Sequence, residues 1–288
     1  MIGIKESRSD LGVRIVSICP SNTELLAYLG LTSSLVGVDN YSDWPEEVHH
    51  LPRVGPDLDI DMEAVKKLNP DLVLASLSVP GMEKNIEALQ AAQLPYVVLN
   101  PNSLEEIGRD ILELGKHTQR EQAAIRVYDA YQALLADYRE RSQRVADRPG
   151  VYWEWWPKPV FTPGKINWLT EISELAGARN VFADRPEPSV QTDWNDVLER
   201  QPEYICLVWV GVEKRRIKPE LVRTRPGWAA LKAVQENRIL VLDEPLFCRP
   251  SPRLLTGLQK LASLLHPSHF PACQEGRDLL RDRLERGR

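Results

Sequence analysis

Aromatic side chains crowd one short stretch of the chain, and their type and spacing indicate a binding surface. The stretch carries Tyr152, Trp153, Glu154, Trp155 and Trp156, and Phe161 follows. Alternate residues of a strand face opposite sides, so one set must enter a core, and we expect Trp153 there. Residues near the end of the strand can instead line a cleft, where flat aromatic walls suit a large planar ligand. We therefore predict ligand contacts for Trp155, Trp156 and Phe161, with core packing as the alternative for Trp156 and Phe161.

Two loops supply further candidates for ligand contact. Tyr41 lies in the sequence YSDWP, directly after an expected strand, and is either a cleft or a core residue. Arg249 opens the sequence RPSPR, in which two prolines stiffen the loop before an expected helix. A guanidinium at this place can bind an anionic or amide-bearing ligand, or it can be a surface charge.

Signatures of catalysis and of metal binding are missing from the sequence. It has no GxSxG, no phosphate-binding P-loop, no HExxH and no GxGxxG. The four cysteines form no CxxC pair, so we expect buried, inert thiols. The alternating acids Asp57, Asp59 and Asp61 could hold a hard cation, but we favour a solvated turn before a helix, where acids suit the helix dipole. The sequence predicts a binding protein and not an enzyme, with no intrinsic cofactor and no metal site.

The composition excludes other classes of protein. The 288 residues carry a formal net charge of −5 and are 43% hydrophobic, which allows a substantial core but no basic surface for nucleic acid. No apolar run approaches the roughly 20 residues that cross a bilayer, so no membrane insertion is expected. Residues 1–12 are too polar for a secretory signal. Two locations stay open: extracytoplasmic, in the periplasm or at the cell surface, if a leader was removed, and cytoplasmic if the chain as given is native.

Periodicity and turn residues give an alternating order of strands and helices. Such alternation predicts an α/β fold with parallel sheets covered on both faces. Strands are expected over residues 14–19, 36–38, 71–75, 96–99 and 239–242. Helices are expected over residues 23–29, 62–68, 82–92, 103–116 and 254–265.

The two halves of the chain share a sequence pattern. TELLAYLG recurs as TEISELAG, and VKKLNPDLVL recurs as VLERQPEYIC, in the same order. A strand before proline at residues 96–99 is echoed at residues 239–242. We infer two similar, Rossmann-like lobes, with the general likeness of all α/β units as the alternative explanation.

One long helix is expected between the two halves. Residues 118–146 contain no glycine or proline, and apolar residues recur at steps of three and four. Thr118 and Glu121 fit a capping box at its start. Roughly 27 helical residues span about 40 Å, so the connection is a rigid rod. The predicted domains are an N-terminal extension (1–12), an N-terminal lobe (13–117), the linking helix (118–147) and a C-terminal lobe with a helical tail (148–288), with a ligand cleft between the lobes.

Five short motifs resemble one known family. They are IVSICPSNTELLAYLG (15–30), VGVDNYSDWP (36–45), NPDLVLA (69–75), FTPGK (161–165) and RPSPR (249–253). Together they resemble the helical-backbone (class III) substrate-binding proteins of ABC importers, which bind vitamin B12, haem and ferric siderophores, and in particular the vitamin B12 binders. The resemblance covers about residues 13–266. It implies two lobes bridged by one helix, capture of a ligand in the cleft and no catalysis.

The resemblance also assigns roles to particular residues. Tyr41, Phe161 and Arg249 stand at positions that contact the ligand, and Glu63 stands where an acid docks on the permease. The chain departs from the vitamin B12 binders at other positions of the family pattern. Ser189 replaces a cleft tryptophan, Pro245 replaces an acid, and Asn195 replaces the second docking acid. The neighbouring acids, Asp243 for the ligand and Asp196 for docking, are then the candidates.

We therefore expect a monomer that captures a corrinoid such as cobalamin, or a related metal chelate, for delivery to an ABC permease. An intracellular carrier of a corrinoid or metal cofactor with the same fold is one alternative. A siderophore or haem binder is another.

Overall fold

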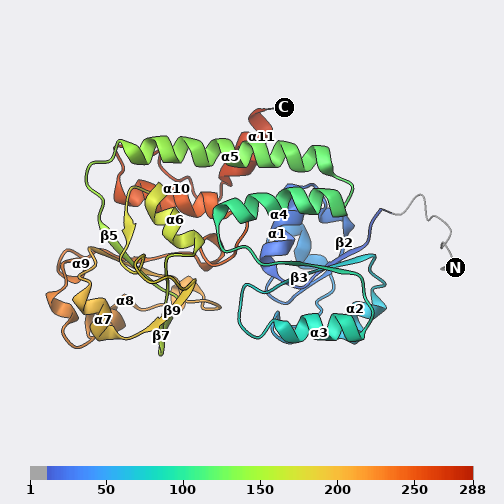
Figure 1. The fold of residues 1–288 in the computed structure, drawn as a ribbon, viewed down its shortest axis with the longest axis horizontal. Helices are drawn as coiled ribbons and strands as arrows, with labels where there is room; N and C mark the ends of the chain where they lie inside the picture. Colours follow the sequence, from blue (N-terminus) through green and yellow to red (C-terminus); the bar gives the residue numbers. More distant parts are fainter. Residues whose placement is uncertain (1–11, 288) are drawn as a thin grey trace. The chain divides into compact units, whose positions relative to one another are not determined.

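The computed structural model describes residues 12–287 and divides into two compact units (Figure 1). Unit 1 contains the described residues up to Asn100 together with Asp110–Ile125. Unit 2 contains Pro101–Arg109 and the described residues from Arg126 onward. Residues 1–11 of the expected N-terminal extension lie outside the described part.

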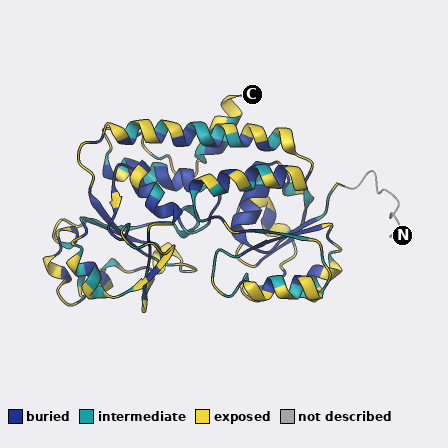
Figure 2. Cartoon of the chain, in the orientation of Figure 1, coloured by how far each residue is buried: buried dark blue, intermediate teal, exposed yellow. Residues whose placement is uncertain are grey.

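Unit 1 is built on a parallel sheet of four strands in the order β2-β1-β3-β4. The strands are β1 (Ile15–Ser17), β2 (Leu35–Val38), β3 (Leu72–Ser76) and β4 (Tyr96–Leu99). β3 is wholly buried, as Figure 2 shows by its dark colour, because helices cover both faces of the sheet. These strands confirm four of the predicted segments within one or two residues at each end.

The helices of unit 1 are α1 (Pro20–Tyr28), α2 (Met62–Lys67) and α3 (Glu83–Ala91), with short 3-10 turns η1 (Thr32–Ser34) and η2 (Glu46–His50). Pro20 is the first residue of α1, three residues earlier than expected, since proline is favoured in the first turn of a helix. Asp61 caps α2 by accepting the N–H groups of Glu63 and Ala64 at 2.9 and 3.0 Å. Asp61 thus lies at the helix N-terminus, where the acidic turn was expected, and is in addition the N-cap.

Each of the helices α4 (Leu104–His117) and α5 (Glu121–Gln143) has residues in both units. The capping box at the start of α4 is confirmed in part, because Ser103 Oγ accepts the N–H of Glu106 at 3.1 Å. The box predicted at Thr118 is wrong. Thr118 Oγ1 donates to the Leu114 carbonyl of α4 at 2.6 Å instead. The left-handed residue Gln119, whose φ is 57°, ends α4, and α5 begins at Glu121.

Unit 2 contains a second parallel sheet of four strands, in the order β11-β10-β5-β8, and a small sheet in the order β6-β7-β9 with antiparallel pairing. The strands of the parallel sheet are β5 (Gly150–Glu154), β8 (Arg179–Asn180), β10 (Tyr204–Leu207) and β11 (Ile239–Val241). The small sheet consists of β6 (Trp156–Pro157), β7 (Val160–Pro163) and β9 (Ser189–Thr192). The predicted α/β class with parallel sheets is confirmed in each unit.

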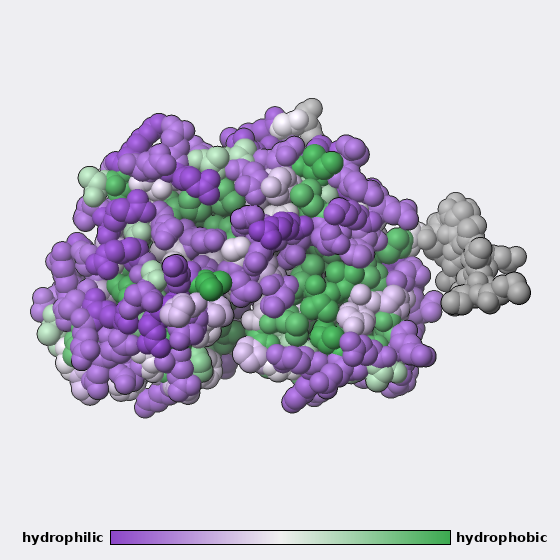
Figure 3. Space-filling view, viewed as in Figure 1, coloured by the Kyte–Doolittle hydropathy of each residue, from purple (hydrophilic) through white to green (hydrophobic). Residues whose placement is uncertain are grey.

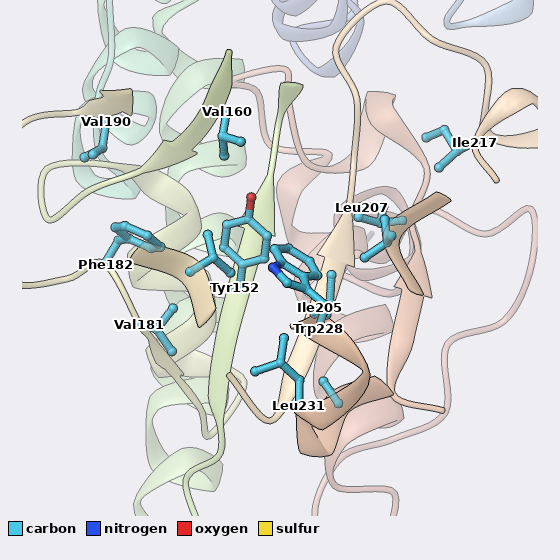
Figure 4. Packing of buried hydrophobic residues seen from close by; sticks show 13 residues of the cluster. Tyr152, Val160, Val181, Phe182, Val190, Ile205, Leu207, Ile217, Trp228 and Leu231 are labelled. Atoms are coloured by element: carbon cyan, nitrogen blue, oxygen red, sulfur yellow. The ribbon is translucent and has the colours of Figure 1, made fainter. Parts of the chain in front are cut away.

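The remaining helices of unit 2 all follow β7 in the chain. They are α6 (Trp168–Leu175), α7 (Trp194–Glu199), α8 (Pro219–Arg223), α9 (Lys232–Gln235), α10 (Leu254–Leu265) and α11 (Leu279–Arg286), with the turns η3 (Lys214–Arg216), η4 (Trp228–Ala230) and η5 (Glu244–Leu246). Figure 4 shows the core on one face of the sheet, where Tyr152, Phe182 and Trp228 meet residues of β10. Ring centroids in this core lie 6.0 Å apart for Tyr152 and Phe182 and 6.1 Å apart for Tyr152 and Trp228.

Backbone conformation supports the internal repeat. Asn69, before β3, and Gln201, before β10, both have a φ of 47°. Gln93 and Asn237 precede β4 and β11 with φ values of 55° and 56°. Left-handed residues other than glycine are uncommon, so their recurrence in the same order favours duplication over a general likeness of α/β units. None of the described helices is long and apolar enough to cross a membrane, and hydrophilic residues cover much of the face shown in Figure 3.

Candidate ligand-binding site

Tyr41 lies in a tight turn at the carboxyl end of β2. Its side chain is 53% exposed, so the core alternative is wrong for this residue. The buried carboxylate of Asp39 accepts the N–H of Tyr41 at 2.7 Å and the N–H of Ser42 at 3.0 Å. These bonds fix the backbone of the turn and leave the phenol ring accessible to a ligand.

A buried polar network anchors the same turn to β1 and α1. Thr23 Oγ1 lies 2.8 Å from both Ser17 Oγ and Ser42 Oγ. Arg53 donates to the carbonyl oxygens of Asp39 and Ser42 at 2.9 and 2.6 Å. Because buried hydroxyl groups need partners, this network fixes one geometry for the loop.

The aromatic candidates of unit 2 come together at the carboxyl end of β5. Trp156 and Phe161 are direct partners in the pairing of β6 with β7, and the Trp155 N–H donates to the Phe161 carbonyl at 2.9 Å. Trp156 is 43% exposed and Phe161 is partly buried, so both residues present surface to solvent. Trp155 is partly buried and tilts against Trp168, with 6.2 Å between the ring centroids. Backbone pairing therefore brings all three residues, called the aromatic group below, onto or beside the pair of strands β6 and β7.

Trp153 has the core position that was expected for it. Its side chain is fully buried, its ring centroid lies 5.4 Å from that of Phe247, and its Nε1–H donates to Ser173 Oγ at 2.9 Å. Both faces of β5 are buried, so the partly exposed aromatic group begins only after Glu154, where the strand ends.

The charged candidates Asp243 and Arg249 are both engaged in ion pairs. Asp243 follows β11 and binds Lys214 at 3.1 Å as well as Lys260. Burial tends to raise the pKa of Asp243, but hydrogen bonds from Lys260 and Lys214 outweigh burial and lower it. Arg249 is 11% exposed at its side chain and lies 3.4 Å from Glu244, so it is not a free surface charge. A ligand that reaches either residue must share these contacts.

Sequence patterns did not reveal the buried ion pair between Glu154 and Arg225. Glu154, the last residue of β5, is fully buried and accepts two hydrogen bonds from the Arg225 guanidinium. Tyr152 Oη and Trp209 Nε1 donate to the same carboxylate at 2.9 and 3.0 Å. Arg225 in turn lies 4.5 Å from the ring centroid of Trp228. The only sequence signal was an acid between aromatic residues in a strand.

The two candidate docking acids differ in their surroundings. Glu63 is in the first turn of α2, 71% exposed at its side chain, and pairs with Lys66 on the same helix. Asp196 is in the first turn of α7, where its carboxylate binds Thr192 Oγ1 and Arg200 Nε, each at 2.7 Å. Asn195 follows the N-cap Asp193 by two residues, as Glu63 follows Asp61, so Asn195 is the structural counterpart of Glu63.

Potential metal ligands do not gather in the described part of the chain. Among residues 12–287, no three His, Cys, Asp or Glu side chains are placed to hold a metal ion. Cys19 and Cys206 are buried as expected, and burial raises the pKa of the Cys19 thiol to about 11. Cys248 and Cys273 are only partly buried.

Exposed aromatic residues follow the carboxyl ends of parallel strands in both units, and α/β folds bind their ligands beyond this edge. Comparison with known proteins makes the assignment specific. Residues 15–246 match the family described as periplasmic binding protein, and the chain belongs to this family.

Relatives and solved structures support this assignment. The chain is 30% identical over 262 residues to the uncharacterized ABC transporter substrate-binding lipoprotein YvrC of Bacillus subtilis, covering 89% of this chain and 81% of the relative. The crystal structure of the periplasmic vitamin B12 binding protein BtuF of Vibrio cholerae is similar with a TM-score of 0.73 and 25% identity, covering 88% of this chain and 97% of that one. A periplasmic heme binding protein from Pseudomonas aeruginosa gives a TM-score of 0.78 and 26% identity, covering 90% and 94%.

Proposed function

We propose that this chain captures a corrinoid such as cobalamin, or a related metal chelate, and delivers it to an ABC permease without catalysing a reaction. The observation that carries the proposal is the exposed Tyr41, fixed on a rigid turn of a fold in the periplasmic binding protein family. An aromatic ring held in place loses little entropy when a flat ligand packs on it, so it suits capture.

The ligand class rests on the aromatic character of the site. Trp155, Trp156 and Phe161 form an apolar group with little charge of its own. Such a surface suits a large ring with a mostly apolar face, and the Vibrio cholerae relative that binds vitamin B12 supports a corrinoid. We propose Tyr41, Trp155, Trp156 and Phe161 as residues that contact the ligand, with Asp243 and Arg249 as candidates for polar contacts.

Haem is the second candidate ligand. A similar structure from Pseudomonas aeruginosa is named as a heme binding protein, and its identity to this chain matches that of the vitamin B12 binder within a percentage point. Haem is also flat and apolar on its faces, so the same aromatic group could accept it.

The proposed partner is an ABC permease, and the proposed location is extracytoplasmic. Both follow from the names of the relatives, which are periplasmic or lipoprotein substrate-binding proteins. Glu63 is the acid best placed to dock on a basic partner, since its side chain is largely exposed at the start of α2. Asp196 is a weaker candidate because its carboxylate already binds Arg200 and Thr192.

Titration of the purified chain tests the ligand class. Tryptophan fluorescence is followed while cyanocobalamin, cobinamide, hemin or a ferric siderophore is added to wild type, Tyr41→Ala and Phe161→Ala. We expect saturable quenching by a corrinoid, with weaker binding in both variants. Binding of hemin alone would select the second candidate, and binding of none of the four would refute the proposal.

A further inference from the structure

We propose that Trp209 is a further ligand-contacting residue of this site and that the buried pair of Glu154 and Arg225 is the device that positions it. This inference rests on the proposed function. It adds a residue that no motif in the sequence indicated and that follows the central strand β10 of unit 2.

The position of Trp209 is the first argument. Beyond the ends of β5 and β10 the two strands stay paired, because Val208 N–H donates to the Glu154 carbonyl and Val210 N–H donates to the Trp155 carbonyl, each at 3.1 Å. Trp209 therefore lies beside Trp155 at the carboxyl edge of the sheet. This is the edge at which parallel α/β sheets bind their ligands.

The order of the strands makes this position central. β10 lies between β5, whose end carries the aromatic group, and β11, whose end carries Asp243. The ladder to β11 also continues past the strands, since Leu242 N–H donates to the Leu207 carbonyl at 3.0 Å. A ligand that reaches both the aromatic group and Asp243 must therefore pass over the end of β10.

The orientation of the indole ring is fixed from inside the unit. Trp209 Nε1 donates to Glu154 Oε1 at 3.0 Å, and this carboxylate is held by Arg225 and by the Tyr152 hydroxyl. The Arg225 guanidinium lies 4.9 and 4.5 Å from the ring centroids of two further tryptophans, which hold it in turn. Glu154, Tyr152 and Arg225 are all buried, and the indole that they support thus has one set orientation.

The exposure of Trp209 separates it from the tryptophans of the core. Trp153 and Trp228 are fully buried, whereas Trp209 packs against the core of unit 2 and keeps part of its surface accessible. The next residue, Val210, is 41% exposed and extends the apolar surface. An indole ring of fixed orientation with one solvent-accessible side is a suitable surface for a flat apolar ligand.

The energetics of the pair favour a positioning role. Burying an ion pair gives little net stability compared with apolar residues of the same size, because both ions lose their hydration. The pair does provide a fixed, charged acceptor for the indole N–H. Glu154 and Arg225 are therefore positioning residues, and Trp209 is the residue that contacts the ligand.

Oxidative footprinting of the wild-type chain tests the contact without any substitution. The chain is exposed to hydroxyl radicals alone and when saturated with whichever of cyanocobalamin and hemin binds. Mass spectrometry then gives the modification of each tryptophan. We expect several-fold protection of Trp209 and little change at Trp194, which lies on α7. Unchanged modification of Trp209 in a saturated sample overturns the inference while the proposed function stands; failure of cyanocobalamin, cobinamide, hemin and the ferric siderophore alike to bind overturns both.

Variants test the positioning. We expect Trp209→Ala to weaken binding about tenfold, a typical loss for one aromatic anchor, and Trp209→Phe to weaken it less. Leu198→Ala is the matched control, because Leu198 packs against the same core from α7 and its loss should lower stability without changing affinity. Glu154→Gln should weaken binding in the wild type but not in the Trp209→Ala background. Equal effects of Glu154→Gln in both backgrounds would refute positioning through Trp209.

Discussion

Asp39 holds Tyr41 in place through the backbone and leaves its ring exposed. The carboxylate accepts the Tyr41 N–H at 2.7 Å from a fully buried position at the end of β2, whereas the phenol is 53% exposed. The geometry of the proposed contact thus depends on a residue that the ligand never touches.

Replacing Asp39 should therefore affect both stability and binding. Asp39→Ala removes hydrogen bonds to a buried carboxylate, so we expect a loss of about 2–4 kcal/mol in the free energy of unfolding, measured in urea. Binding of the ligand should weaken as well, because the turn of Tyr41 loses its support. Asp59→Ala, at an exposed position before α2, is the control and should change neither. A stable Asp39→Ala protein with unchanged affinity would contradict the role of the turn.

Trp156 and Trp153 should separate binding from folding. Trp156 is 43% exposed, so Trp156→Ala should weaken ligand binding and change the melting temperature little. Trp153 is fully buried, so Trp153→Ala should lower the free energy of unfolding by about 3–5 kcal/mol. Calorimetry and ligand titration on the same samples check both outcomes. Loss of stability without loss of affinity in Trp156→Ala would show that this ring has a structural role only.

The ion pair of Glu154 and Arg225 should behave as one unit in unfolding. Removing one partner leaves a buried charge, so Glu154→Gln or Arg225→Gln should each destabilise the chain by about 3–5 kcal/mol. The double variant should lose less free energy of unfolding than the two single variants lose together. Urea unfolding of the wild type, both single variants and the double variant measures this. Additive losses would mean that the two side chains do not depend on each other.

Asp196 should make folding sensitive to acid. Burial acts to raise its pKa, but hydrogen bonds from Thr192 and Arg200 outweigh burial, so the pKa lies below its ordinary value. A carboxyl group whose pKa is lower in the folded chain than in the unfolded chain stabilises the fold above the unfolded-state pKa of about 4. This stabilisation is lost as the pH falls through the pKa of the folded state. Asp196→Asn should therefore show a weaker decline of stability between neutral and acid pH than the wild type. An identical pH dependence would contradict this account.

Docking on the permease should depend on Glu63 and not on Asp196. In vesicles that hold the cognate permease, Glu63→Gln should reduce ligand uptake at unchanged ligand affinity, because its side chain is 71% exposed. Asp196→Asn should leave uptake unchanged at a pH where the variant is folded, since this carboxylate faces Arg200. Equal loss of uptake in both variants would mean that α7 docks through Asp196 after all.

Local patterns predicted the parts of the structure that local physics determines. The strands β3 and β4 and the helix α10 follow from periodicity within a few residues. Thr118 was predicted wrongly because its hydroxyl can serve the helix before it as well as the helix after it.

The site was less predictable because its supports are distant in sequence. Exposed aromatic residues could be proposed from their places after strands, but Trp209 gained its role from a bond to Glu154, 55 residues away. Arg225 lies 71 residues from the carboxylate that it binds. No single-sequence pattern links such residues, since only the folded sheet brings their strands together.

Calorimetric titration of the purified chain with cyanocobalamin, hemin and a ferric siderophore is the most direct test of the central claim, the capture of one metal chelate. We predict a single saturable site per chain for at least one of these ligands, with cyanocobalamin first among them, and weaker binding by Tyr41→Ala. Absence of saturable binding for all three would contradict the claim.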